Sequence, residues 1–162
     1  MEKDRNQSWI DPPTLLLIHQ LIAYQMKIHD EKKNRVEANL RRIGGELGTR
    51  IMMKVSNGHS SRTKDTPAIL KLFASEFWQF AFGKKAQDIV VPNANSITFK
   101  DGDFELITRV SGENNLETNI FADYIEIFCV ALFQSALKFL DLKAEVVMKK
   151  MDKFTIVEVT CV

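Results

Sequence analysis

Residues 120–140 have the sequence IFADYIEIFCVALFQSALKFL. At helical spacing its apolar side chains cover well over half of the circumference, and the polar side chains share one narrow stripe, at Asp123, Glu126, Gln134 and Lys138. A helix that is apolar nearly all round lies in a protein core or in a membrane. Membrane spans carry few or no charges. This run is interrupted or bordered by four ionisable groups, Asp123, Glu126, Lys138 and the flanking Asp141. The stretch therefore predicts a buried core helix that the rest of the chain, or a partner chain with it, must cover.

The bulk composition is that of a globular protein. The chain has 162 residues, 45% hydrophobic and 27% charged, which fits a single domain over residues 11–162 behind a flexible arm at residues 1–10. Its net charge of +1 gives no electrostatic reason to expect nucleic acid as a partner. The polar N-terminus lacks the apolar core of a secretory signal, and two cysteines provide no disulfide framework. These features predict a cytoplasmic protein.

The first expected helix, Pro12–Ile28, carries two apolar stripes. Asp11 and Pro12 give the usual signal for a helix start, a capping residue followed by proline. One stripe consists of Leu15, Ile18, Ile22 and Met26; the other consists of Leu17, Leu21, Tyr24 and Ile28. A helix resting on one core needs only one stripe. The second is therefore either additional core or a surface for another subunit.

A second helix is expected from a cap at Asn34 to about Lys54, because Asn34 and Glu37 have the spacing of a capping box. Its apolar residues keep helical spacing at Val36, Leu40, Ile43, Leu47 and Ile51. Gly44 and Gly48 lie on one side of this helix, where glycine costs about 0.5–1 kcal/mol relative to alanine. Either the two glycines are merely tolerated, or another backbone approaches closely there.

A third helix is expected over residues 66–82, TPAILKLFASEFWQFAF, with a cap-then-proline start at Thr66 and a stop at Gly83. Its main apolar face consists of Ile69, Phe73, Phe77 and Phe80. Trp78 and Phe82 lie one turn apart on nearly the opposite face. This second aromatic face indicates either deep burial or a second subunit contact.

After Pro92, in a short polar stretch, the pattern changes to the alternation of strands. Residues 97–99 and 104–110 flank Asp101 and Gly102 and predict a hairpin. Residues 144–149 and 154–161 predict a second hairpin after the buried helix. The expected fold is therefore α+β, an α/β plait with helices on one face of a four-stranded antiparallel sheet, in the order helix, helix, helix, hairpin, helix, hairpin.

No constellation of catalytic or metal-ligating residues stands out. His19, His29 and His59 have no companion at metal-ligand spacing, and His29 is expected in a solvated charged loop. No phosphate-binding glycine loop or nucleophile elbow occurs. Cys129, in an apolar helix, is expected to be an inert thiol. The sequence predicts no catalytic residue, no metal and no cofactor, and hence no enzyme.

Three segments resemble the small subunits of the TRAPP vesicle-tethering complex. They are IGGELGTRIMMK at residues 43–54, the third-helix segment with Glu76, Phe77 and Trp78, and ITFKDGDFELITRVSG at residues 97–112. Their spacing is similar to that of the subunit-6 type, and the resemblance extends from about Arg35 to the C-terminus. The resemblance implies an α/β-plait scaffold subunit without catalysis of its own.

The resemblance also implies how such a subunit works. Family members pair through their N-terminal helices with another small subunit, as a heterodimer or, in isolation, as a homodimer. The assembly tethers vesicles in ER-to-Golgi and Golgi traffic, is peripheral to those membranes, and promotes nucleotide exchange on a Rab-type GTPase. The expected interface consists of Leu17, Leu21, Tyr24, Ile28, Gly44, Leu47, Gly48 and Ile51, with a second contact at Trp78 and Phe82.

Two further points concern ligands. One branch of the family carries a fatty acyl chain on a cysteine, and the matching position here is about Ser60, which cannot form the thioester. The alternative function is a small-molecule or lipid-binding sensor of related plait fold. Haem is disfavoured for such a sensor, because only His19 could lie on a buried helix face.

Overall fold

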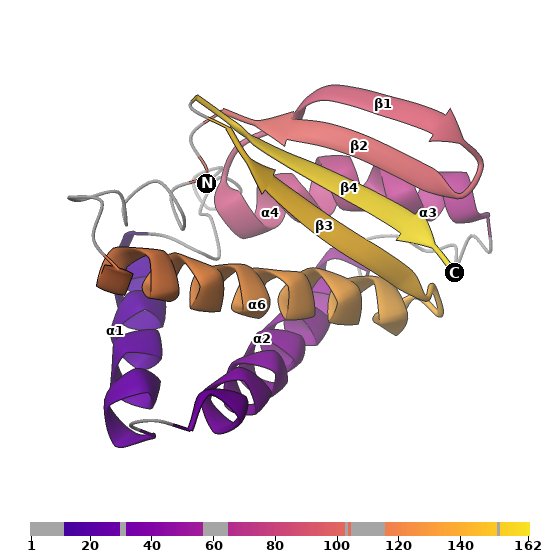
Figure 1. The fold of residues 1–162 in the computed structure, drawn as a ribbon. Coiled ribbons are helices and arrows are strands. Elements are labelled where there is room, and N and C mark those ends of the chain that lie inside the picture. The colour runs from indigo at the N-terminus through magenta and orange to yellow at the C-terminus, as the bar shows by residue number, and fades with distance from the viewer. Residues whose placement is uncertain (1–11, 30–31, 57–64, 103, 105–115, 152) are drawn as a thin grey trace, which may run out of the picture.

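The computed structural model describes residues 12–29, 32–56, 65–102, 104, 116–151 and 153–162. Four strands form one antiparallel sheet in the order β1-β2-β4-β3, and the helices cover one of its faces (Figure 1). The strands are β1 (Gln87–Asn93), β2 (Ser96–Asp101), β3 (Ala144–Lys150) and β4 (Thr155–Cys161). The predicted α+β class, sheet and element order are therefore confirmed.

The sheet has a buried face and an open face, as its alternating sequence requires. Inward-pointing residues are buried at Ile97, Phe99, Val157 and Val159 on the two central strands and at Val146 and Met148 on β3. The open face carries polar contacts, among them two bonds from Lys149 Nζ to the carboxylate of Glu158 at 2.7 and 2.8 Å. The helices must therefore pack on the buried face alone.

The central helix α6 (Leu116–Phe139) lies between the sheet and α2 (Lys33–Ser56), as Figure 1 shows. Its Ile125, Leu132, Phe133, Ala136 and Leu137 have no exposed surface, which confirms the predicted core helix. By length and composition the segment Asn119–Phe139 could cross a membrane, with a mean hydropathy of 1.6, but half of it is buried inside the protein. A soluble core helix passes the same test, so this composition is weak evidence for a span.

Two glycines allow α2 to approach the backbone of α6. A Cβ atom added to Gly48 would lie 1.9 Å from the carbonyl oxygen of Leu132, and one added to Gly44 would lie 2.5 Å from that of Phe128. No side chain larger than hydrogen fits at these distances. The prediction of a close backbone approach is confirmed, and the approaching backbone belongs to the same chain.

Helix α1 (Pro12–Ile28) has the predicted bounds, whereas α2 begins earlier than its capping pattern indicated. The first helical residue of α2 is Lys33, and the amide of Val36 bonds to the carbonyl of Lys32 at 3.3 Å. Asn34 therefore lies inside the first turn, and its assignment as the cap was wrong. The apolar spacing of α2 was right, because Val36, Leu40 and Ile51 are buried.

The predicted third helix is continuous over Thr66–Phe82 but contains a π-helical turn, so it is divided into α3 (Thr66–Leu72), η1 (Phe73–Phe77) and α4 (Trp78–Phe82). The N-cap of this helix is Asp65, in extended conformation. Thr66, the predicted cap, is the first helical residue instead. Gly83 ends the helix in the left-handed region at φ 73°, as glycine readily does.

The first hairpin lies earlier in the chain than predicted. Strand β1 includes Pro92, which the sequence pattern places in a polar stretch before the strands, and pairs with β2 around a turn at residues 94–95. Proline is tolerated there because β1 is an edge strand, and the pairing is irregular on both sides of Val90. The predicted strand at residues 97–99 is part of β2, while residues 105–110 lie outside the described part of the chain.

Candidate functional site

The outer face of α1 is an exposed apolar ridge. Leu15, Ile18 and Ile22 form the inner stripe and are buried, as predicted. The opposite side chains remain in solvent, with exposed fractions of 58% for Leu16, 64% for Leu17, 57% for Tyr24 and 47% for Ile28. Three of these belong to the second predicted stripe. In this structure that stripe is therefore surface rather than core.

An apolar groove of about 370 Å³ lies beside this ridge, between α1 and α2. Leu17, Ile18 and Leu21 of α1 line one side, and Ile43 and Leu47 of α2 line the other. Phe128 of α6 also lines it, consistent with α6 crossing both helices in Figure 1. Side chains of a second protein that fit this groove would bury apolar surface on both partners.

Polar side chains join α1 to α2 where the two helices converge. The amide nitrogen Nδ2 of Asn39 donates to Oε1 of Gln25 at 3.0 Å and lies 3.2 Å from Nε2 of His29. His29 lies in the turn after α1, where a loop was predicted, but it is half-buried in this cluster rather than fully solvated. The cluster links the C-terminal part of α1 to α2 beside the groove.

Several residues assigned to the interface from sequence lie inside the protein instead. Gly44, Gly48 and Ile51 are buried, the two glycines against α6, and Trp78 has no exposed surface. Phe82 is half-buried and packs on Trp78, with ring centroids 4.6 Å apart. For the four buried residues the interface assignment is corrected, because their surface is already used within the chain, while Phe82 stays a prediction. Leu17, Leu21, Tyr24, Ile28 and Leu47 stay predictions.

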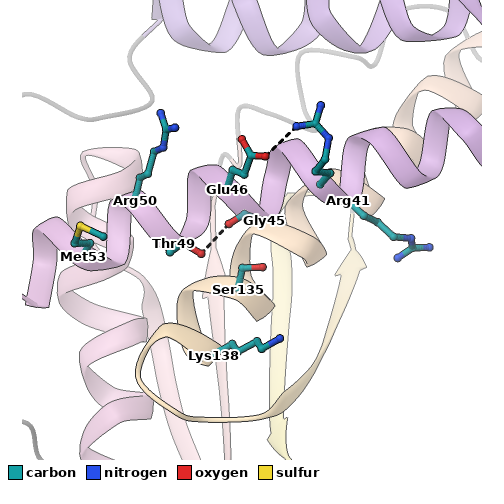
Figure 2. Close-up of a pocket in the computed structure, with 9 residues that line it drawn as sticks. Arg41, Gly45, Glu46, Thr49, Arg50, Met53, Ser135 and Lys138 are labelled. Carbon is teal, nitrogen blue, oxygen red and sulfur yellow. Dashed lines mark hydrogen bonds and ion pairs between the residues drawn. The ribbon is translucent and has the colours of Figure 1, made fainter.

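A second groove, of about 710 Å³, crosses from α2 to α6 and is lined by charged side chains (Figure 2). Four lining residues are basic, Arg41, Arg42, Arg50 and Lys138, and one is acidic, Glu46. Sequence reasoning missed this groove. Arg42, Glu46 and Arg50 recur every four residues and signal a charged helix face, but Lys138 is distant in sequence and only the fold brings it there.

The two grooves adjoin each other, because Glu46 and Arg50 of α2 line both. Together they form one face with an apolar part over α1 and a basic part over α2 and α6. A model of the transport protein particle (TRAPP) component family matches residues 14–161. The chain belongs to the TRAPP component family. It is therefore a subunit of a vesicle-trafficking complex and assembles with other TRAPP subunits.

A solved TRAPP structure has the same fold. It is the crystal structure of a trafficking protein particle complex subunit 3 from Naegleria fowleri, a protein covalently bound to palmitic acid in that structure. The TM-score is 0.70 at 14% identity, over 91% of this TRAPP component and 93% of the Naegleria chain. No curated protein matches the sequence. The position expected for an acylated cysteine, about Ser60, lies outside the described residues.

The cysteines of this TRAPP component are poor nucleophiles. Burial, and after it the carboxylate of Glu126, raise the pKa of the Cys129 thiol far above its usual range, so Cys129 stays protonated. Burial also raises the pKa of Cys161. Within the described ranges, no three His, Cys, Asp or Glu side chains gather closely enough to hold a metal ion. The face on α1, α2 and α6 is the strongest candidate site in the described part of the chain, and its exposed apolar side chains suit contact with another protein.

Proposed function

We propose that this chain is a non-catalytic scaffold subunit of a TRAPP tethering complex and docks another small TRAPP subunit through α1. The observation that carries the proposal is the exposed ridge of Leu16, Leu17, Tyr24 and Ile28 beside an apolar groove. Contiguous exposed apolar surface of this kind typically marks a protein-binding site. Tyr24 combines a large apolar ring with a polar tip, which suits an interface centre.

The partner is another TRAPP small subunit, giving a heterodimer, and the isolated chain can use the same ridge to form a homodimer. We expect the interface to bury at least about 1,200 Å² in total, the lower end of the range for stable complexes. Family resemblance supports the wider role. The complex works peripherally at ER and Golgi membranes in ER-to-Golgi and Golgi traffic, and as an assembly it promotes nucleotide exchange on a Rab-type GTPase.

The experiment purifies the tagged full-length chain from its source cells and identifies the TRAPP components that accompany it by mass spectrometry. The same purification is made with Leu17→Glu and Tyr24→Glu combined. Both side chains are exposed, so the substitutions leave the fold intact but place two carboxylates in the apolar ridge. We expect the wild type to retain a TRAPP small subunit and the variant to lose it.

A matched control carries Ile89→Glu and Val90→Glu, which change two exposed apolar residues of β1 in the same way. This control is expected to retain the partner. Circular dichroism must show equal folding of all three proteins. Retention of the same TRAPP subunit by the Leu17 and Tyr24 variant would show that the α1 ridge is not the docking surface.

A further inference from the structure

The basic groove contains positive charge that no carboxylate in the described part of the chain neutralises. Arg42 Nη1 pairs with Glu46 Oε1 at 2.9 Å, and Arg41 Nη2 lies 3.6 Å from Glu37 Oε2. Neither Arg50 nor Lys138 has an ion-pair partner among the residues that the structure describes. Within the described ranges, the groove thus offers the cations of Arg50 and Lys138 to a bound molecule, beside two that are already paired.

The basic groove is shallow where α2 and α6 meet, and its lining includes the apolar side chain of Met53 as well as polar groups. A Cβ atom added to Gly45 would lie 2.8 Å from Oγ of Ser135, so α2 and α6 approach closely where glycine faces serine. The hydroxyl of Thr49 donates to the carbonyl of Gly45 at 3.0 Å. Figure 2 shows Ser135 of α6 beside Gly45 and Thr49 of α2, with Lys138 one turn further along α6 and Arg50 projecting from the other side of α2. Polar groups and basic side chains thus line an open surface that suits carboxylates.

We propose that an acidic ridge of the partner subunit occupies this basic groove, so that the face selects an acidic partner over a second copy of this chain. The inference rests on the proposed function, because the basic groove adjoins the apolar groove on which the partner docks. Carboxylates of the partner pair with Arg50 and Lys138. Such charges at an interface rim set partner choice and association rate.

A second copy of the chain is a poor occupant on electrostatic grounds. A two-fold dimer uses the same patch on both subunits, so the basic grooves of the two copies would lie in the same interface. The groove has four basic residues against one acidic residue, and α1 adds Lys27 with no carboxylate of its own. Like charges would oppose that pairing. A flat anionic bilayer fits less well, because the adjoining apolar part is a groove between two helices.

The test uses the TRAPP small subunit that co-purifies with the wild-type chain. Its dissociation constant is measured from about 0.05 M to about 0.5 M NaCl, a range over which exposed charges become screened. We expect Arg50→Glu combined with Lys138→Glu to weaken binding about tenfold or more at low salt and to flatten the salt dependence. Arg50→Lys combined with Lys138→Arg keeps both charges and should bind within about threefold of wild type.

A charge-matched control, Lys71→Glu with Lys85→Glu, reverses two exposed charges elsewhere and should bind as wild type does. Unchanged affinity and salt dependence in the Arg50 and Lys138 variant would overturn this inference. If the Leu17 and Tyr24 variant still lost the partner, the proposed function would stand. If both variants kept the partner, the proposed function would fall as well.

Two further measurements distinguish the other occupants. Light scattering should show that the partner subunit displaces any homodimer that the wild-type chain forms alone through α1, whereas a homodimer that the partner cannot displace would assign the face to a second copy. Vesicles with about 30% phosphatidylserine should not bind the chain through Arg50 and Lys138. Vesicle binding that the double charge reversal abolishes would assign the groove to membranes and overturn the inference.

Discussion

The indole nitrogen Nε1 of Trp78 donates a hydrogen bond of 2.7 Å to Oδ2 of Asp101 in the interior of the protein. Trp78 has no exposed surface and Asp101 is 1% exposed. The other carboxylate oxygen, Oδ1, forms an ion pair with Nζ of Lys84. This contact joins the end of β2 to the helix behind the sheet, and it explains why a carboxylate can lie in an aromatic core.

We expect Asp101→Ala to lower the free energy of unfolding by about 1–3 kcal/mol, because it leaves the buried indole N–H of Trp78 without an acceptor. Asp101→Asn should cost less, since its carbonyl oxygen can still accept that bond. Urea unfolding followed by tryptophan fluorescence measures both. Asp88→Asn removes an exposed ion pair with Lys100 and should change stability by no more than about 1 kcal/mol. Equal losses for the two Asp101 variants would contradict the role given to the hydrogen bond.

Gly48→Ala should destabilise the protein by about 1–3 kcal/mol, although alanine is the better helix former. The new methyl group would meet the backbone oxygen of Leu132, which can move only if α2 and α6 separate. Gly45→Ala is the matched control in the same helix. Its methyl group meets only the hydroxyl of Ser135, which can rotate away, so stability should change little. Thermal unfolding of both variants decides the matter, and a stable Gly48→Ala protein would contradict the close packing.

The stability of the protein should depend on pH through Glu126. Burial, and after it the carboxylate of Asp123, raise the pKa of Glu126 above its ordinary value. The folded state therefore holds this proton more tightly than the unfolded state, and ionised Glu126 destabilises the fold at neutral pH. Glu126→Gln should be more stable than wild type at pH 7. The difference should shrink as pH falls through the folded pKa and vanish below about pH 4.

Glu145→Gln on the exposed face of β3 is the control for this pH dependence, and it should leave the unfolding curves near those of wild type. Urea unfolding of each protein between pH 4 and pH 7 gives the comparison. A Glu126→Gln protein that is less stable than wild type at pH 7 would mean that the carboxylate is stabilised by its surroundings rather than hindered by burial.

Asn39→Ala should loosen α1 while leaving the sheet unchanged. The substitution removes the contacts of Asn39 with Gln25 and His29, worth about 0.5–1.5 kcal/mol for a hydrogen bond of this kind. Amides of α1 should then exchange with deuterium faster, and amides of β4 should not. Asn34→Ala, at an exposed position of the same helix, is the control. Unchanged exchange in α1 would show that apolar packing alone holds the helix in place.

The sequence by itself determined the order and type of the elements. Helical periodicity located α1 within its observed bounds and marked Val36, Leu40 and Ile51 as the buried side of α2, because burial of one helix face leaves a 3.6-residue pattern. Gly44 and Gly48 predicted a close backbone approach, because a residue without a Cβ atom on one helix face leaves room for another backbone. Alternation located part of β2. The predicted cap at Asn34 and the predicted polar stretch at Pro92 were wrong, because local signals at helix ends and in edge strands are weaker than tertiary contacts.

The candidate site was determined by the sequence only in part. The second stripe of α1 could be named from periodicity, but a stripe does not say whether it faces core or solvent. Only the tertiary structure placed Leu17 and Tyr24 outside and Trp78 inside, because burial depends on which segments distant in the chain pack on a face. The same reason applies to the basic groove, which Lys138 of α6 and Arg50 of α2 both line. The periodicity of one helix identifies which residues share a face. Which other segment packs on that face is decided only when the whole chain folds.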